Sequence, residues 1–523
     1  MNGADRKIEA ESNWPSHTSQ SVSRSTDIGI LGAGVSGVLM GMLFRRAGMD
    51  SFTIYEKQPD VGGTWYQNTY PGLCCDVPSH LYSYSFEPNP GWSNVYADQA
   101  EIQRYIRACA AKYRLLERTR FNTTVDTGHF DAQTGEWLLK LANGEHMRHR
   151  LLVSATGGLT APNLPRIEGY EDYEGKYWHS GNWRHDVGLA GKRVAVVGSA
   201  ASAVQVVPEV ARRAAKLTVF QRSPNWIVPR GNRTYSSEEK QAFAGNNDTW
   251  RRHWRKLYRR SLLLHQVFHR EDRSVDALRQ LCLQPMYDAI RDPVLRASLT
   301  PNYEPGCKRI LVSDDYYPAL AQKHVSLIPS GIKRLSRGGV VTSDEREFEA
   351  DVVIFCTGYK LGGRADGSPA VKVFGLGGRP LTDLLARRPD AYRGVSLPGF
   401  PNYFTVVGIN GVVAYTSLFL SAEVNGEHII RMTRAALKPG VKFLDVDEQA
   451  TVSYSSSLQD RLQQMSWAGD CTNFYKNSKG RILSFYPGSL GEMRRSHRQD
   501  SGEHYRIVDR GMIDAIDGAR YDD

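Results

Sequence analysis

Two stretches of the chain share one pattern of apolar and polar residues. In the first, the apolar run that begins at Asp27 leads directly into Gly32, Gly34 and Gly37, and an apolar-periodic segment then continues to about Gly48. A second apolar run, SFTIYE, ends at Glu56. Short apolar runs bounded by glycine predict buried strands, and the periodic segment between them predicts a helix. The stretch therefore predicts a strand, a glycine-rich turn, a helix and a second strand that ends in an acid.

The glycine spacing of this stretch is typical of a dinucleotide-binding unit. Gly32 permits the tight turn, Gly34 lets the backbone approach a pyrophosphate, and Gly37 lets the helix pack on the strand. Free N–H groups at the helix N-terminus attract phosphate. Glu56, about twenty residues beyond the motif, can accept a hydrogen bond from a ribose hydroxyl. A GxGxxG motif alone is weak evidence, whereas the complete unit predicts a dinucleotide site.

The stretch KRVAVVGSAASAVQ, which begins at Lys192, repeats the pattern with changes. Gly198 supplies the turn, but Ala200 stands at the second glycine position and Ala203 at the third. The extra methyl of Ala200 is expected to weaken or re-pose pyrophosphate binding, at a cost of about 1–3 kcal/mol if nothing relaxes. The next apolar strand ends in Gln221-Arg222, where a cation suits the 2′-phosphate of NADP. The alternative is that Arg222 is a solvated strand end.

Further patterns predict the elements around these two units. Asp98 and Glu101 form a capping-box pair before a helix that runs to Tyr113. Alternating runs with Gly135 and Asn143-Gly144 between them predict an antiparallel meander, and LLVSATGG is a buried strand after it. Residues 234–300 are predicted to be helical. The strand at 351–359 repeats the apolar run with Thr-Gly, and we expect it to return the chain to the first unit.

Two segments raise the question of membrane contact. Residues 403–420 are long and apolar, but Asn410, two glycines and several hydroxyls interrupt them, which predicts buried interior chain. Residues 249–270 form a basic amphipathic helix with Trp250, Trp254, Leu257, Leu264 and Phe268 near helical spacing. Such a helix can lie on a membrane surface. A helical insertion whose apolar stripe meets its own domain is the favoured alternative.

Composition narrows the class of protein. A chain of 523 residues with 41% hydrophobic and 23% charged residues is typical of a globular protein of two or three domains. Its net charge of +10 favours anionic ligands without requiring nucleic acid. The seven cysteines are too few and too scattered for a network of disulfides, which favours a reducing, cytoplasmic location. They also lack the CxxC spacing of metal ligands, so we expect no metal site. The polar, Ser-rich residues 1–25 predict a disordered tail.

Two long motifs give a resemblance to a family. YEGKYWHSGNW resembles the fingerprint FxGxxxHxxxW of Baeyer–Villiger monooxygenases, with Tyr173 in place of Phe and with Gly175, His179 and Trp183 in register. The aromatic loop GGTWYQNTYPGLCCD resembles a second signature of that family. The matching residues of the loop are Gly63, Trp65, Tyr70, Pro71, Gly72 and Asp76. The resemblance extends from about residue 26 to about residue 500, and includes fungal members of specialised metabolism.

The resemblance implies an α/β fold with two Rossmann-like, three-layer ββα domains. One domain would bind FAD and the other NADP, with a helical insertion in the second. The expected division is a tail at 1–25, the first part of the FAD-binding domain at 26–165, the NADP-binding domain at 166–344 with its insertion at about 234–300, and the second part of the FAD-binding domain with the C-terminal segment at 345–523.

The resemblance also implies roles for individual residues. Arg309 would stabilise the deprotonated C4a-peroxide of the flavin, because its charge cannot be titrated away, and Asp76 would fix the guanidinium and assist hydride transfer. Neighbours in an extended segment point opposite ways, so Lys308 can face the 2′-phosphate while Arg309 faces the flavin. His179 would couple NADPH binding to domain motion. The other residues expected at the cofactors are Gly63, Thr64, Trp65, Tyr82, Ser199, Ser202, Thr357 and Gly358.

The implied reaction is an NADPH- and O2-dependent insertion of oxygen beside a ketone, on a bulky specialised metabolite. Ala200 and the GINGV segment at 408–412 depart from the family pattern. Three alternatives stay open: heteroatom oxygenation or hydroxylation, an FAD-dependent dehydrogenase or cyclase with impaired NADPH use, and a non-catalytic FAD-binding protein. The presence of both Asp76 and Arg309 argues against the last alternative.

Overall fold

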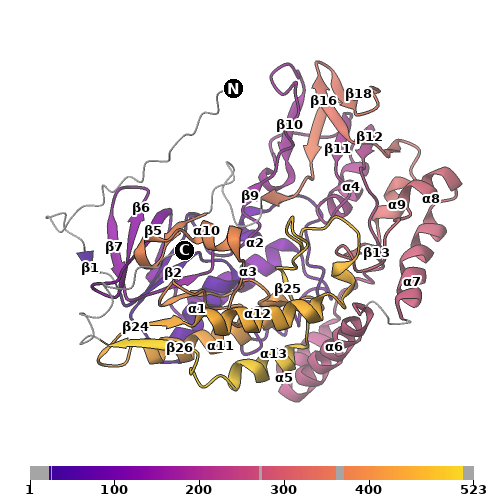
Figure 1. Cartoon of the computed structure of the whole chain (residues 1–523). Helices are drawn as coiled ribbons and strands as arrows, with labels where there is room; N and C mark the ends of the chain where they lie inside the picture. The colour runs from indigo at the N-terminus through magenta and orange to yellow at the C-terminus, as the bar shows by residue number, and fades with distance from the viewer. Residues whose placement is uncertain (1–22, 25, 270–273, 361–369, 510–523) are drawn as a thin grey trace, which may run out of the picture.

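Two five-stranded parallel sheets form the framework of the chain (Figure 1). The computed structural model describes residues 23–24, 26–269, 274–360 and 370–509. The first sheet has the order β22-β8-β2-β3-β4, built from Tyr403–Thr405, Leu151–Ser154, Ile28–Leu31, Phe52–Tyr55 and Thr119–Arg120. The second has the order β10-β19-β11-β12-β15, built from Lys176–His179, Val352–Phe355, Arg193–Val197, Lys216–Phe220 and Val325–Ile328. All neighbouring strands within both sheets are parallel, as the βαβ pattern predicts.

Strand β19 corrects one expectation from the sequence. We expected it to return the chain to the first unit, but it pairs with β10 and β11 at the centre of the second sheet. The chain re-enters the first sheet only at β22, which pairs with β8. All four residues of β19 are buried, and an apolar run of this kind indicates a buried strand without indicating its sheet.

An antiparallel meander covers each parallel sheet. The first consists of β5, β6 and β7 (Val125–Asp131, Glu136–Leu141, His146–His149), as the alternating runs predict. The second consists of β16, β17 and β18 (Ile332–Ser336, Gly339–Thr342, Glu347–Glu349). Alternate residues of β8 serve two cores: Leu152 packs with the meander, whereas Leu151 and Val153 pack with helices α1 (Val35–Arg46) and α11 (Leu418–Ala436). The first sheet therefore lies between a meander layer and a helix layer.

The described residues between 234 and 300 are largely helical, as predicted. They form α5, α6, α7 and α8 (Ser237–Gly245, Asn247–Val267, Ser274–Ala289, Pro293–Leu299). In Figure 1, α7 and α8 lie beside the second sheet, whereas α5 and α6 lie next to α13 (Leu490–Arg498). On α6, Trp250 is buried and Trp254 packs against the chain's own core, while the six cations of residues 251–260 are largely exposed. The apolar stripe of α6 thus meets its own chain. No helix among the described residues is long and apolar enough to cross a membrane.

The segment at 403–420 is interior chain interrupted by turns. It contains β22, β23 (Val412–Val413) and the start of α11. The buried Asn410 donates hydrogen bonds through Nδ2 to the carbonyls of Ile482 and Phe485, 3.0 and 2.8 Å away. The GINGV loop is therefore fixed to the C-terminal part of the chain, where β24, α12, β25, α13 and β26 follow (Val441–Val446, Glu448–Leu462, Phe485–Tyr486, Leu490–Arg498, Tyr505–Asp509).

Three smaller expectations can be checked. Most of the tail at 1–25 lies outside the described residues, and its described part, Ser23–Arg24, forms strand β1 beside β7. Helix α3 (Gln99–Lys112) begins where predicted, but only half of the capping box forms: Asp98 accepts from the Glu101 N–H, while the Glu101 carboxylate accepts from the Ser93 N–H. The structure also contains a disulfide, Cys307–Cys471, that the number and spacing of the cysteines did not predict.

Candidate active site

The first glycine-rich turn joins β2 to α1. Gly32 has a φ of +98°, and its N–H donates to the Tyr55 carbonyl at 2.8 Å. A Cβ on Gly32 would lie 2.7 Å from the Ala155 carbonyl oxygen, and one on Gly37 would lie 1.8 Å from that of Gly32. Both glycines are therefore required by the turn and by the close packing of the helix. Helix α1 has no side-chain cap and no acid in its first turn, so its N-terminus can attract an anion.

Glu56 and the aromatic loop lie beside this turn. The turn, the N-terminus of α1 and Glu56 are together called the first cradle below. The buried Glu56 carboxylate accepts hydrogen bonds from the backbone N–H groups of Ala33 and Gln58, at 2.7 and 2.8 Å. Gly62 pairs with Gly34 in an isolated bridge, and a Cβ on Gly63 would lie 2.9 Å from the Gly34 Cα. The beginning of the aromatic loop thus lies directly on the glycine-rich turn.

The second turn joins β11 to α4 (Ala203–Ala211) with the same geometry. Gly198 has a φ of +117°, its N–H donates to the Phe220 carbonyl at 2.9 Å, and its Cβ would lie 2.4 Å from the Cys356 carbonyl oxygen. Ala203 is buried at the first turn of α4, whereas Ala200 is exposed. Ser202 stands at the N-cap of α4 without a side-chain hydrogen bond to the helix, and the first turn carries no acid. The turn between β11 and α4 and the N-terminus of α4 are called the second cradle below. This cradle therefore also presents a helix N-terminus that can attract an anion.

A pair of cations borders the second cradle. Lys308 Nζ donates to Ser223 Oγ at 3.2 Å, and Ser223 is the residue after the exposed Arg222. Ser199 Oγ donates to the Ser223 carbonyl at 3.0 Å, which joins this border to the glycine-rich turn. Burial and the nearby charge of Arg222 lower the pKa of Lys308. Within the described part of the chain, neither cation pairs with a carboxylate, so the site favours an added anion.

The aromatic loop extends from the first cradle to the second. Tyr70 packs in the core of the second sheet, and its hydroxyl donates to Gln205 Oε1 on α4 at 3.2 Å. Gln205 Nε2 in turn donates to the Cys74 carbonyl at 2.9 Å. A Cβ on Gly72 would lie 2.6 Å from the Gln205 carbonyl oxygen. The loop is rigid because it is packed between two units, and its last residue is Asp76.

Asp76 forms an ion pair with Arg309, a residue 233 positions away. Arg309 Nε donates to Asp76 Oδ2 at 3.0 Å, and Nη2 donates to the same oxygen. Burial is the largest single influence on Asp76 and opposes its ionisation, but the charge of Arg309, its hydrogen bond and the charge of Arg230 together outweigh burial, so the pKa of Asp76 lies below its ordinary value. The Arg309 side chain stays 47% exposed. Its neighbour Lys308 contacts Ser223 at the second cradle, so the two adjacent cations have partners on different segments.

Comparison with known proteins decides the family. The flavin-binding monooxygenase-like family model matches residues 25–239. A Baeyer–Villiger monooxygenase of Pseudomonas aeruginosa is 38% identical over 490 residues, which cover 93% of this chain and 92% of that protein. The chain belongs to the Baeyer–Villiger type of flavin-dependent monooxygenases. A FAD-binding monooxygenase of Aspergillus niger is 33% identical over 92% of this chain and 81% of that protein. The solved structure of OTEMO in complex with FAD and NADP is 25% identical, with a TM-score of 0.83 over 92% of this chain and 99% of that chain.

In this monooxygenase the fingerprint lies at the edge of the second sheet. Gly175 leaves room for the Tyr173 ring, since a Cβ there would lie 2.2 Å from the Tyr173 hydroxyl oxygen. Burial lowers the pKa of His179, and its Nδ1 accepts from the Gly181 N–H at 3.0 Å. The His179 ring contacts the edge of Tyr359, and the Tyr359 hydroxyl donates to Asn68 in the aromatic loop. Trp183 packs edge-on against Trp178. His179 thus connects the second sheet to the loop that bears Asp76.

The remaining predicted residues lie around the two cradles. Thr64 begins the short helix α2 (Thr64–Gln67) directly after Gly63. The Trp65 indole N–H donates to the Tyr82 hydroxyl at 3.0 Å. Thr357 donates to the Asn163 carbonyl at 2.6 Å, and Gly358 has a φ of +80°. Cys74 and Cys75, in the aromatic loop, are free thiols.

Two side chains at the site make contacts that were not predicted from the sequence. Arg230 donates to Cys74 Sγ at 2.8 Å and to the Val312 carbonyl at 2.9 Å, which ties the loop to β14 (Leu311–Val312). Asn473 Nδ2 donates to the Cys307 carbonyl at 2.8 Å. The sequence offers no signal for these contacts, because the partners are distant in the chain.

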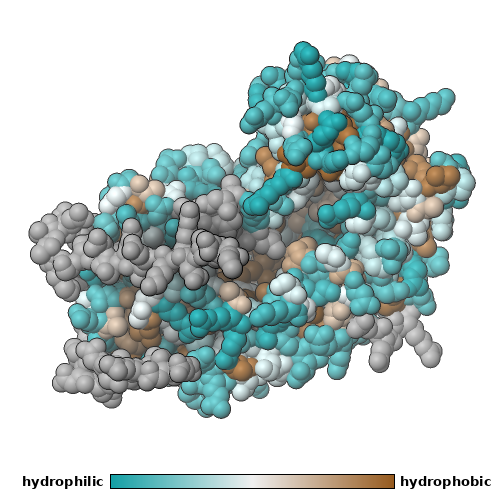
Figure 2. All heavy atoms as spheres, turned by 45° about the horizontal axis from the view of Figure 1, so that its top comes forward, coloured by the Kyte–Doolittle hydropathy of each residue, from teal (hydrophilic) through white to brown (hydrophobic). Residues whose placement is uncertain are grey.

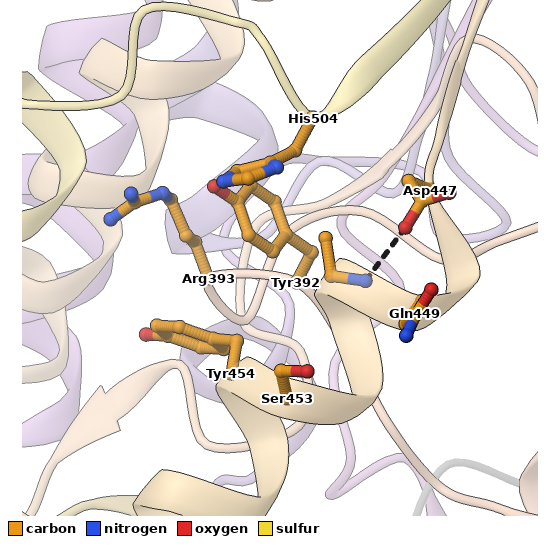
Figure 3. A pocket seen from close by; sticks show the side chains of 8 residues that line it. Tyr392, Arg393, Asp447, Gln449, Ser453, Tyr454 and His504 are labelled. Carbon is orange, nitrogen blue, oxygen red and sulfur yellow. Dashed lines mark hydrogen bonds between the residues drawn. The ribbon is translucent and has the colours of Figure 1, made fainter.

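A separate surface cavity lies away from this site. It has a volume of about 490 Å³ and is lined by Tyr392, Arg393, Asp447, Gln449, Ala450, Ser453, Tyr454 and His504 (Figure 3). Asp447 caps α12 by accepting from the Ala450 N–H at 2.7 Å. None of these residues belongs to a cradle or to the aromatic loop.

Proposed function

We propose that this monooxygenase binds FAD at the first cradle and NADP(H) at the second, and uses O2 to insert one oxygen atom beside a ketone carbonyl. The product is an ester or a lactone. The Asp76–Arg309 pair carries the proposal, because distant segments bring a permanent, partly exposed cation to the end of the loop that joins the two cradles. In the space-filling view, a hollow lies between the upper lobe and the rest of the molecule, with hydrophobic residues on its floor (Figure 2).

The residues of the first cradle fit FAD. The uncapped α1 N-terminus and the Cβ-free surface of Gly34 suit a pyrophosphate, and Glu56 suits a ribose. With its meander and helix layers, the first sheet would be one Rossmann-like domain of three layers. The OTEMO structure, which holds both cofactors, supports this assignment.

The residues of the second cradle fit NADP. The uncapped α4 N-terminus suits the pyrophosphate. Arg222 and Lys308, which pair with no carboxylate among the described residues, suit the 2′-phosphate that distinguishes NADP from NAD. Strand β19 and the second meander belong to this unit, which would be the second Rossmann-like domain, with α5–α8 as its insertion.

Reduced flavin supplies the activation of O2, which no side chain of the chain provides. Arg309 stabilises negative charge on the oxygen that attacks the ketone. Asp76 Oδ2 accepts both Nε and Nη2, which fixes the guanidinium plane and leaves Nη1 free of described hydrogen bonds. Asp76 also raises the pKa of Arg309, so Arg309 donates hydrogen bonds and keeps its proton. The substrate we propose is a bulky ketone of specialised metabolism, in line with the similarity to the Aspergillus niger monooxygenase.

Product analysis tests this function. The purified protein is incubated with NADPH, O2 and a panel of bulky ketones and, separately, thioethers. We expect ester or lactone products from ketones, identified by mass and NMR, with NADPH consumption to match. Formation of sulfoxides alone would support heteroatom oxygenation instead. Failure of NADPH to bleach the flavin would support the dehydrogenase or non-catalytic alternatives.

A further inference from the structure

The segment that carries Lys308 and Arg309 has no regular secondary structure of its own. Residues 300–310 are coil and turn between α8 and β14. Both cations must nevertheless be held to within about half an ångström for two different cofactors, because small misplacements of charged groups cost large factors in rate. Contacts from elsewhere in the chain must supply this order.

A C-terminal segment, residues 466–476, supplies these contacts and is called the clamp below. Cys471 forms a disulfide with Cys307, which directly precedes Lys308. Asn473 donates to the Cys307 carbonyl at 2.8 Å. A Cβ on Gly306 would lie 2.6 Å from Ser466 Oγ, and one on Gly469 would lie 3.1 Å from Cys307 Sγ. One covalent bond, one hydrogen bond and two close contacts therefore converge on the residues just before Lys308.

The clamp is itself well anchored. The Ser466 N–H donates to the Phe268 carbonyl at 2.7 Å at the end of the α6 segment, and Trp467 is buried. The Asn473 carboxamide oxygen accepts from the Tyr475 and Lys476 N–H groups at 3.0 and 3.2 Å. Tyr475 is buried between Phe474 and Phe485. Because the clamp is held in place by these contacts, it can fix the position of Lys308 and Arg309.

We propose that the Cys307–Cys471 disulfide and Asn473 are positioning residues for Lys308 and Arg309, and that thiol reduction at this bond lowers both NADPH selectivity and oxygen insertion. This inference rests on the proposed function. Cys307 is buried, whereas Cys471 is partly exposed, so a dithiol reaches the bond from the Cys471 side. The dithiol gives two electrons and two protons, the S–S bond becomes two thiols, and the dithiol becomes a disulfide.

The test compares Cys471→Ser and Asn473→Ala with Cys109→Ala, which removes a buried free thiol on α3. Flavin reduction is measured with NADPH and with NADH, and ester yield is measured per NADPH consumed. We expect Cys471→Ser to raise the KM for NADPH about tenfold and to divert reducing equivalents to H2O2, with a smaller effect for Asn473→Ala. The KM for NADH, which has no 2′-phosphate, should stay the same, as should all values for Cys109→Ala.

Reversible reduction gives a second measurement that does not depend on a variant folding. Dithiol treatment of the wild type should reproduce the Cys471→Ser values, reoxidation should restore them, and Cys471→Ser should not respond. Equal increases in the KM for NADPH and for NADH would contradict the proposed role of the clamp. Unchanged NADPH selectivity and ester yield in the reduced wild type would also contradict it. Absence of ester from the untreated wild type would instead contradict the proposed function. In that case the KM values for flavin reduction by NADPH and by NADH would still test the role of the clamp.

Discussion

The two cradles use one backbone design for sites of opposite charge. In each, a glycine with positive φ donates its N–H to the end of the next strand, at 2.8 Å for Gly32 and 2.9 Å for Gly198. In each, that glycine lies against the carbonyl that precedes a Thr-Gly pair, at Ala155 and at Cys356. The strand after the helix then ends at Glu56 in one cradle and leads to Arg222 in the other. The shared backbone makes both sites suitable for a pyrophosphate, and the strand ends make them differ.

The cradles also differ in how tightly they are packed. At the third motif position, a Cβ on Gly37 would lie 1.8 Å from the Gly32 carbonyl oxygen, whereas Ala203 already carries a Cβ in the same place. At the second position, Gly34 is half-buried and a Cβ on it would lie 3.5 Å from the Gly63 Cα, whereas Ala200 is exposed. The glycine-rich turn of the first cradle is therefore the more tightly packed of the two.

The strongest test of this difference is a methyl group at the third position. Gly37→Ala forces the α1 N-terminus away from Gly32, at a cost of about 1–3 kcal/mol or more, and we expect the protein to purify without flavin. The matched change Ala203→Gly should leave flavin content and turnover nearly unchanged, apart from about 0.5–1 kcal/mol of stability. Absorbance of bound flavin and thermal unfolding measure both variants. Full flavin content in Gly37→Ala would contradict the tight packing inferred for the first cradle.

A change of charge at the second strand end should have the next largest effect. Hydrogen bonds to charged groups are worth about 1.5–3 kcal/mol, so Arg222→Ala is expected to raise the KM for NADPH about 10- to 100-fold and to leave the KM for NADH unchanged. Arg212→Ala is a matched control, because Arg212 lies at the other end of α4 and pairs with Glu209. Steady-state kinetics with both nucleotides give the answer. Equal changes for NADPH and NADH would mean that Arg222 does not recognise the 2′-phosphate.

The smallest expected effect is at the second position of the second cradle. Because Ala200 is exposed, we expect the cost of its methyl to fall on the bound nucleotide. Ala200→Gly is therefore expected to lower the KM for NADPH by about threefold to tenfold, at the low end of the cost of an added methyl. An unchanged KM would mean that the nucleotide already accommodates the methyl.

Local patterns predicted the parts of the molecule that depend on local chemistry. The glycine turns, the meander at 125–149 and the helices of residues 234–300 follow from spacing and periodicity, and the structure contains them. The Asp76–Arg309 pair was implied by the family resemblance, and the ion pair is present. Its contribution to catalysis stays a prediction.

Features that depend on partners far apart in the chain could not be predicted. The sheet of β19 is set by pairing with β10 and β11, and any buried parallel strand has a similar apolar run. The Cys307–Cys471 bond joins residues 164 positions apart, and cysteine spacing contains no information about such a pair. The contacts of Arg230 and Gln205 with the aromatic loop also depend on how the two units pack.

The central claim is that Arg309 holds negative charge on the attacking oxygen, and Arg309→Ala tests it most directly. In a single-turnover experiment, NADPH first reduces the bound flavin of the variant, and O2 and a ketone accepted by the wild type are then added. We predict retained FAD, measurable flavin reduction, and ester formation lower by about 10²- to 10³-fold, with H2O2 released in its place. Ester formation at the wild-type rate would contradict the account.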